Sequence, residues 1–199
     1  MIFDWDMPQR RIPVYLLFDT SGAMLENGLI SELENGLRAL MKALLSHPAT
    51  REAVWISLIT FSEEARQIPL TPIVDFTLMP MLASGPSNLG AALRLLNDSL
   101  ERDIIYGTSV RRGDYRPAVT IVLNGAPTGV WQEEALRLEA YQARHKLTLI
   151  FLGIGPVVPD YEVIKQLASA TWELERPTRQ SINNFFRQIS EALTPVWTD

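Results

Sequence analysis

The chain reads Arg11-Ile12-Pro13-Val14-Tyr15-Leu16-Leu17-Phe18-Asp19-Thr20-Ser21-Gly22-Ala23 near its beginning, an apolar run followed at once by an acid and two hydroxyl residues. A short apolar run that ends at turn-forming residues is typical of a strand buried on both faces of a sheet. Residues 13–18 are therefore predicted to form a central strand, and Asp19 to be the first polar residue at its carboxyl end.

Apolar runs of the same form recur along the chain. Three lie at 54–61, 118–123 and 148–152, and a shorter one lies at 65–68. Pro69 and Pro72 follow the shorter run closely, and proline is tolerated in sheets mainly at their edges. The run at 65–68 is therefore predicted to be an edge strand.

Between these runs the apolar residues recur with a helical period, which predicts helices over 30–44, 89–104, 131–145, 161–168 and 181–193. Strands that alternate with helices require a mainly parallel sheet covered on both faces, because each crossover must pass over the sheet. The predicted fold class is α/β, doubly wound and Rossmann-like. No internal repeat or interdomain linker is found, so residues 1–199 are predicted to be one domain, with an N-terminal extension at 1–10 and a core at 11–194.

Composition limits the classes of partner and chemistry. With 18 Lys+Arg against 23 Asp+Glu, the formal net charge of -5 disfavours attraction to nucleic acid or anionic lipid. The absence of cysteine excludes disulfides, thiolate catalysis and cysteine-based metal sites. Residues 1–6 carry acids where a signal peptide needs bases, and no run reaches the roughly 20 apolar residues of a membrane span. We expect a cytoplasmic location, with neither a nucleic-acid nor a membrane partner.

In doubly wound folds, ligands bind in the crevice beyond the carboxyl ends of the strands. This rule selects three loops of the chain, at 19–25, 85–88 and 124–130. Asn88 or Ser87 can cap the helix that follows the second loop. The Asn124-Gly125 pair is typical of a turn that requires positive φ.

These three loops together resemble the metal-ion-dependent adhesion site of von Willebrand factor A domains. The first family motif, Asp-x-Ser-x-Ser, here reads Asp19-Thr20-Ser21-Gly22-Ala23. Ser87 stands where the family has a threonine, and Asn124 stands where it has an aspartate. The resemblance implies a six-stranded sheet with a single ligand-binding edge.

Within that superfamily, residues 11–17, 68–72 and 88–93 look like the bacterial TerY-like proteins that are associated with tellurium-resistance gene clusters. The similarity covers residues 7–193. It implies a role in assembling protein complexes, in a stress-response or phosphorylation-linked system. The partners that it implies are a Ser/Thr protein kinase and a PP2C-type phosphatase.

An intact adhesion site holds Mg²⁺ with hydroxyl and carboxylate oxygens, which are the ligands that hard cations prefer. Asp19, Ser21, Ser87 and Asn124 are the candidate ligands here, but Ala23 removes one oxygen and Asn124 lacks the negative charge. The loop 124–129 resembles a family Asp-Gly-Glu-Pro-Thr-Asp segment that has lost three acids. We therefore expect a degenerate site without a strongly held cofactor. The alternative, a Mg²⁺-dependent binder that recognises an acidic residue of its partner, stays open, as does a structural role for Asp19 and Ser21 in a tight turn.

Without a cation, the same edge could bind a partner through apolar side chains. The sequence offers Met24, Leu25 and Trp131 in or near these loops, and Met79, Met81 and Leu82 as well. Such residues also serve as core. Catalysis is not expected, because His47 and His145 are the only histidines and both lie at predicted helix ends. No phosphate-binding glycine loop occurs either. The sequence thus predicts a noncatalytic protein-interaction module.

Overall fold

A computed structural model describes residues 10–156 and 161–194 of the chain. All of the predicted N-terminal extension except residue 10 therefore lies outside the described residues. The helices and strands follow one another as β1 (Ile12–Asp19), the 3-10 helix η2 (Gly22–Gly28), α1 (Leu29–Ser46), α2 (Pro48–Ala53), β2 (Val54–Phe61), β3 (Ala65–Pro72), α3 (Leu89–Asp103), β4 (Ala118–Asn124), α4 (Gln132–Arg144), β5 (Thr148–Ile154), α5 (Tyr161–Leu167), β6 (Ala170–Leu174) and α6 (Arg179–Leu193).

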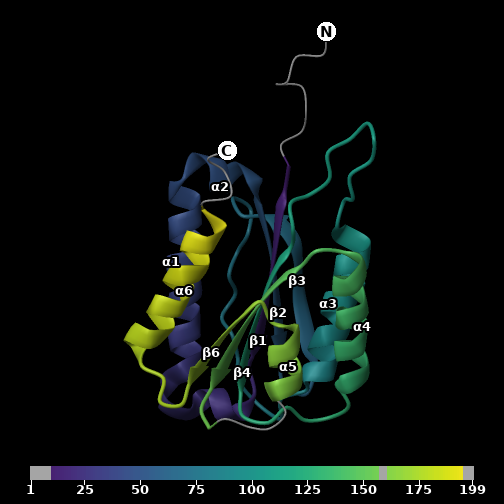
Figure 1. Cartoon of the computed structure of the whole chain (residues 1–199). Helices are drawn as coiled ribbons and strands as arrows, with labels where there is room; N and C mark the ends of the chain where they lie inside the picture. The colour runs from purple at the N-terminus through teal and green to yellow at the C-terminus, as the bar shows by residue number, and fades with distance from the viewer. Residues whose placement is uncertain (1–9, 157–160, 195–199) are drawn as a thin grey trace.

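The strands form one six-stranded sheet in the order β3-β2-β1-β4-β5-β6. Only β3 runs antiparallel to its neighbour β2, and the other four pairings are parallel. Helices α1 and α6 cover one face of the sheet, and α3, α4 and α5 cover the other (Figure 1). The predicted fold class, a doubly wound and mainly parallel α/β sheet, is confirmed.

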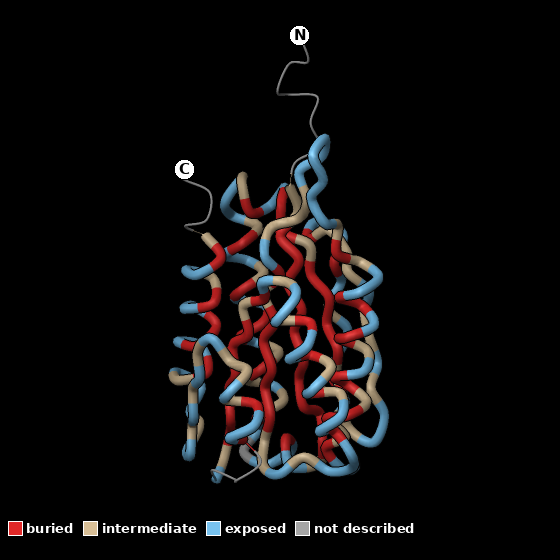
Figure 2. The backbone as a smooth tube through the Cα atoms, turned by 45° about the vertical axis from the view of Figure 1, so that its right-hand side comes forward, coloured by how far each residue is buried: buried red, intermediate tan, exposed pale blue. Residues whose placement is uncertain are grey.

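The two faces of the sheet carry two separate hydrophobic cores, because successive side chains of a strand point to opposite faces. In β1, Val14, Leu16 and Phe18 join the core beneath α1 and α6. Tyr15 and Leu17 join the core beneath α3 and α4. Figure 2 shows the strands as the buried centre of the molecule, with exposed loops at both ends of the sheet.

Three elements were not identified from the residues, namely the 3-10 helix η2, the helix α2 and the strand β6. The prediction treated Pro48 only as a break before β2, but Pro48 starts the short helix α2. Its fixed φ and missing amide are tolerated at the first position of a helix. Strand β6 lies at the edge of the sheet, with half-buried and exposed residues in alternation, so it lacks the continuous apolar run of a central strand. The edge position predicted for residues 65–68 is confirmed, and β3 extends from there to Pro72.

The long segment 73–88 connects β3 to α3 without regular helix or strand structure. It starts beside β2, where the Ile73 amide donates to the Val54 carbonyl at 3.0 Å. It ends at the carboxyl edge of the sheet, where the Ser84 amide donates to the Thr20 carbonyl at 2.9 Å. The segment therefore runs back along the sheet to its carboxyl edge, where residues 79–88 lie beside the end of β1. Among the described residues, no helix is both long and apolar enough to cross a membrane.

Candidate functional site

Asp19 is the last residue of β1 and is fully buried, yet it receives hydrogen bonds from three loops. The Ser21 amide donates to Oδ1 at 2.7 Å, while the Ser87 hydroxyl and the Asn124 amide donate to Oδ2 at 2.9 and 3.1 Å. The predicted convergence of the loops 19–25, 85–88 and 124–130 is therefore observed. We call the four residues Asp19, Ser21, Ser87 and Asn124 the Asp19 site.

Backbone hydrogen bonds hold the three loops against one another. The Gly22 amide donates to the Gly85 carbonyl at 2.8 Å, and the Thr128 amide donates to the Ser87 carbonyl at 2.7 Å. The side chain of Asn88 caps α3 by accepting from the Ala91 amide at 3.2 Å. Asn88 is thus the capping residue, and the neighbouring Ser87 hydroxyl is free to bind Asp19.

Asn124 fixes the third loop through its side chain. Its Nδ2 donates to the Ala23 carbonyl at 3.1 Å, so it ties the end of β4 to the loop after β1. Gly125 has φ 73°, which confirms the turn predicted for the Asn124-Gly125 pair. Gly155, with φ 80°, passes so close that a Cβ there would lie 2.8 Å from Asn124 Oδ1. The amide side chain is therefore enclosed by backbone on two sides.

The donor set can be tested against a divalent cation. The site offers one carboxylate, two hydroxyls and the amide oxygen of Asn124, and the Ala23 carbonyl nearby already accepts from Asn124 Nδ2. Across residues 10–156 and 161–194, no group of three or more His, Cys, Asp or Glu side chains could hold a metal ion. Mg²⁺ in proteins is usually bound by one or two carboxylates together with further oxygens. These residues supply one negative charge, so a Mg²⁺ ion here would need further oxygen ligands from water or from a partner.

Ser21 points to an unfilled interaction in the site. Its hydroxyl is buried and makes no hydrogen bond of normal geometry among the described residues, although it lies close enough to Asp19 to offset part of the rise that burial causes in the pKa of that carboxyl. A buried hydroxyl without a partner is costly, so such groups in native proteins call for an explanation. The Ser21 hydroxyl is therefore the one atom of the Asp19 site that favours an additional ligand.

The electrostatics of Asp19 follow from its burial. Loss of contact with water raises the pKa of its carboxyl above the ordinary 3.8, and the hydrogen bonds from Ser21, Asn124 and Ser87 offset part of this rise. Among the described residues, no other acid shares the site to repel or replace it. The carboxylate is thus held mainly by neutral donors of the chain itself.

The apolar residues predicted for partner binding divide into two groups. Met24 lies in η2 and is 0% exposed, and Trp131 precedes α4 and is 2% exposed. These two side chains belong to the two cores, so the prediction that they contact a partner is corrected. Met81 is buried as well. Of the predicted partner-binding residues Met24, Leu25 and Trp131, Leu25 alone faces solvent.

Four large apolar side chains are exposed on the segments that surround the Asp19 site. They are Leu25, Met79, Leu82 and Val130, with exposed fractions of 60%, 66%, 83% and 79%. Met79 and Leu82 also line a groove of about 570 Å³ that Thr20 and Ser84 connect to the site. We call these four residues the apolar rim. Val130 was missed from the sequence because only the fold shows that it is turned outward beside the buried Trp131.

Gly90 allows the loop before α4 to pack against the start of α3. A Cβ at this position would lie 2.4 Å from the Val130 carbonyl oxygen and 3.3 Å from the Trp131 Cα. Gly90→Ala is expected to lower the free energy of unfolding by about 1–2 kcal/mol, because overpacking against backbone exceeds the gain in helix propensity. Urea denaturation measures this loss. At Gly22 an added Cβ would meet only ordinary contacts, so equal losses for Gly22→Ala and Gly90→Ala would contradict the steric explanation.

Comparison with known proteins supports the architecture. No family model and no curated protein matches the sequence. Among solved structures, the pilus adhesin SpaC of Lactobacillus rhamnosus GG has a TM-score of 0.70 at 11% identity, over 93% of this chain and 30% of SpaC. The von Willebrand factor domain of the type V pili tip protein Mfa5 of Porphyromonas gingivalis has a TM-score of 0.69 at 8% identity, over 96% of this chain and 97% of that domain.

A third neighbour is a metal-bound protein. Proximal thread matrix protein 1 of the mussel byssus, in a structure whose adhesion-site motif is occupied by zinc, has a TM-score of 0.62 at 16% identity. The alignment covers 94% of this chain and 49% of the mussel protein. The chain thus spans less than half the length of SpaC and of the mussel protein. Together with the sheet order and the convergent loops, these likenesses show that the chain has the von Willebrand factor A fold.

Proposed function

We propose that the protein is a noncatalytic protein-interaction module that binds a partner at the carboxyl edge of its sheet without a strongly held metal. The observation that carries this proposal is the apolar rim of Leu25, Met79, Leu82 and Val130 around the Asp19 site. The four side chains lie on loops that are hydrogen-bonded to one another, and two of them line a groove. Exposed apolar side chains on such loops are typical of surfaces that bind other proteins. Protein interaction is also the general role of domains with this fold.

The hydrogen bonds of Asp19 support binding without a metal. Both carboxylate oxygens already accept from donors of the chain, and no second acid of residues 10–156 or 161–194 stands beside them. A cation would have to compete with the Ser87 hydroxyl and the Asn124 amide for Oδ2. Asp19 then serves to hold three loops together, and the rim on those loops binds the partner.

The finer assignment rests on the sequence resemblance. We infer a scaffold or regulator in a TerY-like, cytoplasmic stress-response system, with a Ser/Thr protein kinase and a PP2C-type phosphatase as partners. For a noncatalytic role, the support is the placement of the two histidines. His47 precedes α2 and β2, and His145 precedes β5, so both lie at the amino edge of the sheet, away from the Asp19 site.

One observation favours a second function, a Mg²⁺-dependent binder that recognises an acidic residue of its partner. The buried Ser21 hydroxyl makes no hydrogen bond of normal geometry within the described part of the chain, and a cation beside Asp19 would give it a partner. Titration with Mg²⁺, followed by calorimetry and by the melting temperature, separates the two functions. We expect no saturable change. A saturable shift in the wild type that Asp19→Ala abolishes would support the metal-dependent function instead.

The rim itself is tested by a charge placed within it. Leu82→Asp is expected to reduce recovery of the partner at least about tenfold, because a charge buried in an apolar contact loses its hydration. The measurement is a pull-down from the native host, quantified by mass spectrometry. Leu136→Asp is the matched control, since Leu136 is 64% exposed on α4 and lies outside the rim. Equal recovery with both variants would remove Leu82 from the binding surface.

A further inference from the structure

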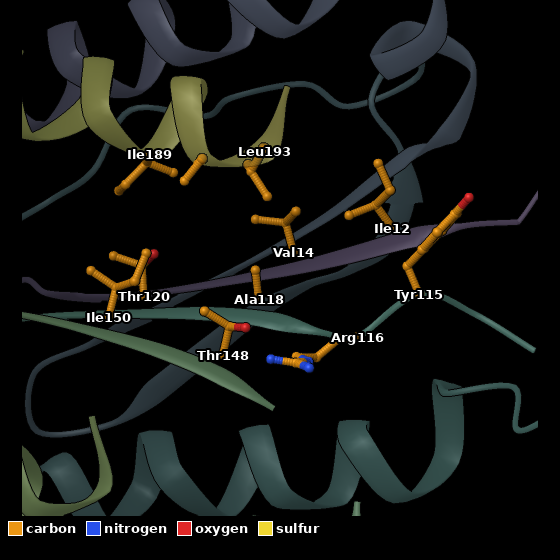
Figure 3. A pocket seen from close by; sticks show the side chains of 11 residues that line it. Ile12, Val14, Tyr115, Arg116, Ala118, Thr120, Thr148, Ile150, Ile189 and Leu193 are labelled. Atoms are coloured by element: carbon orange, nitrogen blue, oxygen red, sulfur yellow. The ribbon is translucent and has the colours of Figure 1, made fainter. Parts of the chain in front are cut away.

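A second cavity lies at the amino edge of the sheet, at the far end of the strands from the Asp19 site. It has a volume of about 390 Å³ and lies between the last turns of α6 and strands β1, β4 and β5. Figure 3 shows Ile189 and Leu193 of α6 on one side of this space, opposite Val14 and Ala118 on the strands. The cavity does not depend on the proposed partner-binding edge.

The sequence explains why the space is left open. Val14, Ala118 and Thr148 stand side by side across the three parallel strands, on the face that α6 covers. The middle and last of these side chains are small, so they do not reach the helix. Helix α6 packs mainly on α1, through residues such as Phe186 that fill the core beneath both helices. Its C-terminal end therefore stands above small side chains, and the space between them remains unfilled.

The walls of the cavity are apolar except for four side chains, one of which is the phenol of Tyr115. Thr120 and Thr148 bring hydroxyls from β4 and β5, and Arg116 brings a guanidinium from the residues just before β4. Arg116 is exposed and makes no ion pair within the described part of the chain. Figure 3 shows Arg116 beside the strands, at the same end of the cavity as Thr148. An apolar space with one unpaired cation at its end is complementary to an apolar molecule with one negative charge.

The surroundings of Arg116 add positive charge. A neighbouring cavity at the same edge shares Arg116 and is also lined by Arg144 and Lys146, neither of which makes an ion pair within the described residues. The acid that lines it, Asp114, is already held by Arg11 at 2.6 Å. The described side chains around Arg116 are therefore locally positive, although the chain as a whole carries a net charge of -5. The local charge favours an anion over a neutral or cationic ligand.

We propose that the cavity binds a medium-chain aliphatic monocarboxylate, with its chain between α6 and the strands and its carboxylate on Arg116. A guanidinium binds a carboxylate through two parallel hydrogen bonds, and the hydroxyl of Thr148, which lies at the same end of the cavity, can donate to the same group. The volume lies near the lower end of the roughly 300–1,000 Å³ range of ligand pockets, which suits a single short chain and excludes a two-chain lipid.

The probe for this proposal is sodium octanoate, titrated into the full chain below its micelle-forming concentration and followed by calorimetry. We expect saturable binding of one molecule. Affinity should rise about fourfold for each added methylene from hexanoate to decanoate, the factor that corresponds to about 0.8 kcal/mol per buried methylene. 1-Octanol, which has the same chain without the charge, should bind at least about tenfold more weakly.

Two variants assign the binding to this cavity. Arg116→Gln removes the cation at an exposed position and should weaken octanoate at least about tenfold while leaving 1-octanol unchanged. Arg176→Gln, at an exposed arginine beyond β6, is the matched control and should bind octanoate as the wild type does. Far-UV circular dichroism verifies that both variants are folded. Absence of saturable binding to the wild type, or equal weakening by both variants, overturns the proposal.

Discussion

Replacing Trp131 with alanine is expected to lower the free energy of unfolding by about 3–5 kcal/mol. The indole is 2% exposed and is among the largest fully buried side chains of the described part of the chain. It fills the core beneath α3 and α4, where Leu89 and Ala135 are its fellow members. Alanine would leave a cavity that the packed helices cannot close. Such a loss is a large fraction of the total stability of a single domain.

Urea denaturation followed by circular dichroism measures this effect, since the chain contains five tryptophans and a fluorescence signal would change with the substitution itself. Leu25→Ala is the matched control. Leu25 is 60% exposed, so its loss should change the free energy of unfolding by no more than about 0.5 kcal/mol. If Trp131→Ala is as mild as this control, the indole is not part of the core.

The same pair of variants distinguishes folding from binding. Trp131→Ala would reduce recovery of a partner simply because less of the protein is folded, although its side chain contacts no partner. Leu25→Ala would reduce recovery only if the apolar rim binds the partner. A pull-down with these variants therefore has an interpretation only when the folded fraction of each is measured beside it.

The sequence predicted the central strands well because each is a continuous apolar run between turn residues. It predicted the approach of Asp19, Ser87 and Asn124 because the carboxyl ends of parallel strands meet at one edge. It could not show which way Met24 and Leu25 face. Adjacent residues of a 3-10 helix point in different directions, and only the packing of η2 against the sheet buries one and exposes the other.

Other features depended on contacts between distant parts of the chain. The groove beside the rim is formed by the return of residues 73–88 along β3, and this irregular segment has no periodic pattern to predict its course. The amino-edge cavity needs small residues on β4 and β5 opposite the end of α6, which only the register of the sheet brings together. A residue pattern within one segment of the sequence cannot predict an unfilled space that several strands and a helix enclose together.

Asp19→Ala is expected to lower the free energy of unfolding by about 2–4 kcal/mol at neutral pH. The substitution leaves the Ser21 and Asn124 amides without their acceptor, and each unsatisfied buried donor costs about 1–3 kcal/mol. Removal of a buried carboxylate offsets part of this cost, because burial raises the pKa of Asp19. Asp75→Ala, at an exposed acid, should stay within about 0.5 kcal/mol of the wild type.

The pH dependence of the stability lost in Asp19→Ala tests whether the burial of the carboxyl or its hydrogen bonds dominate. Because the pKa of Asp19 is raised, the folded protein binds the proton more tightly than the unfolded chain, whose carboxyl titrates near 3.8. The wild type therefore loses stability from Asp19 as pH rises through the raised pKa, and the alanine variant does not. The difference in the free energy of unfolding between the wild type and Asp19→Ala should be larger near pH 4 than at pH 7. A difference that grows towards pH 7 would mean that the hydrogen bonds from Ser21, Ser87 and Asn124 outweigh burial and hold the carboxylate charged, the state that a divalent cation requires.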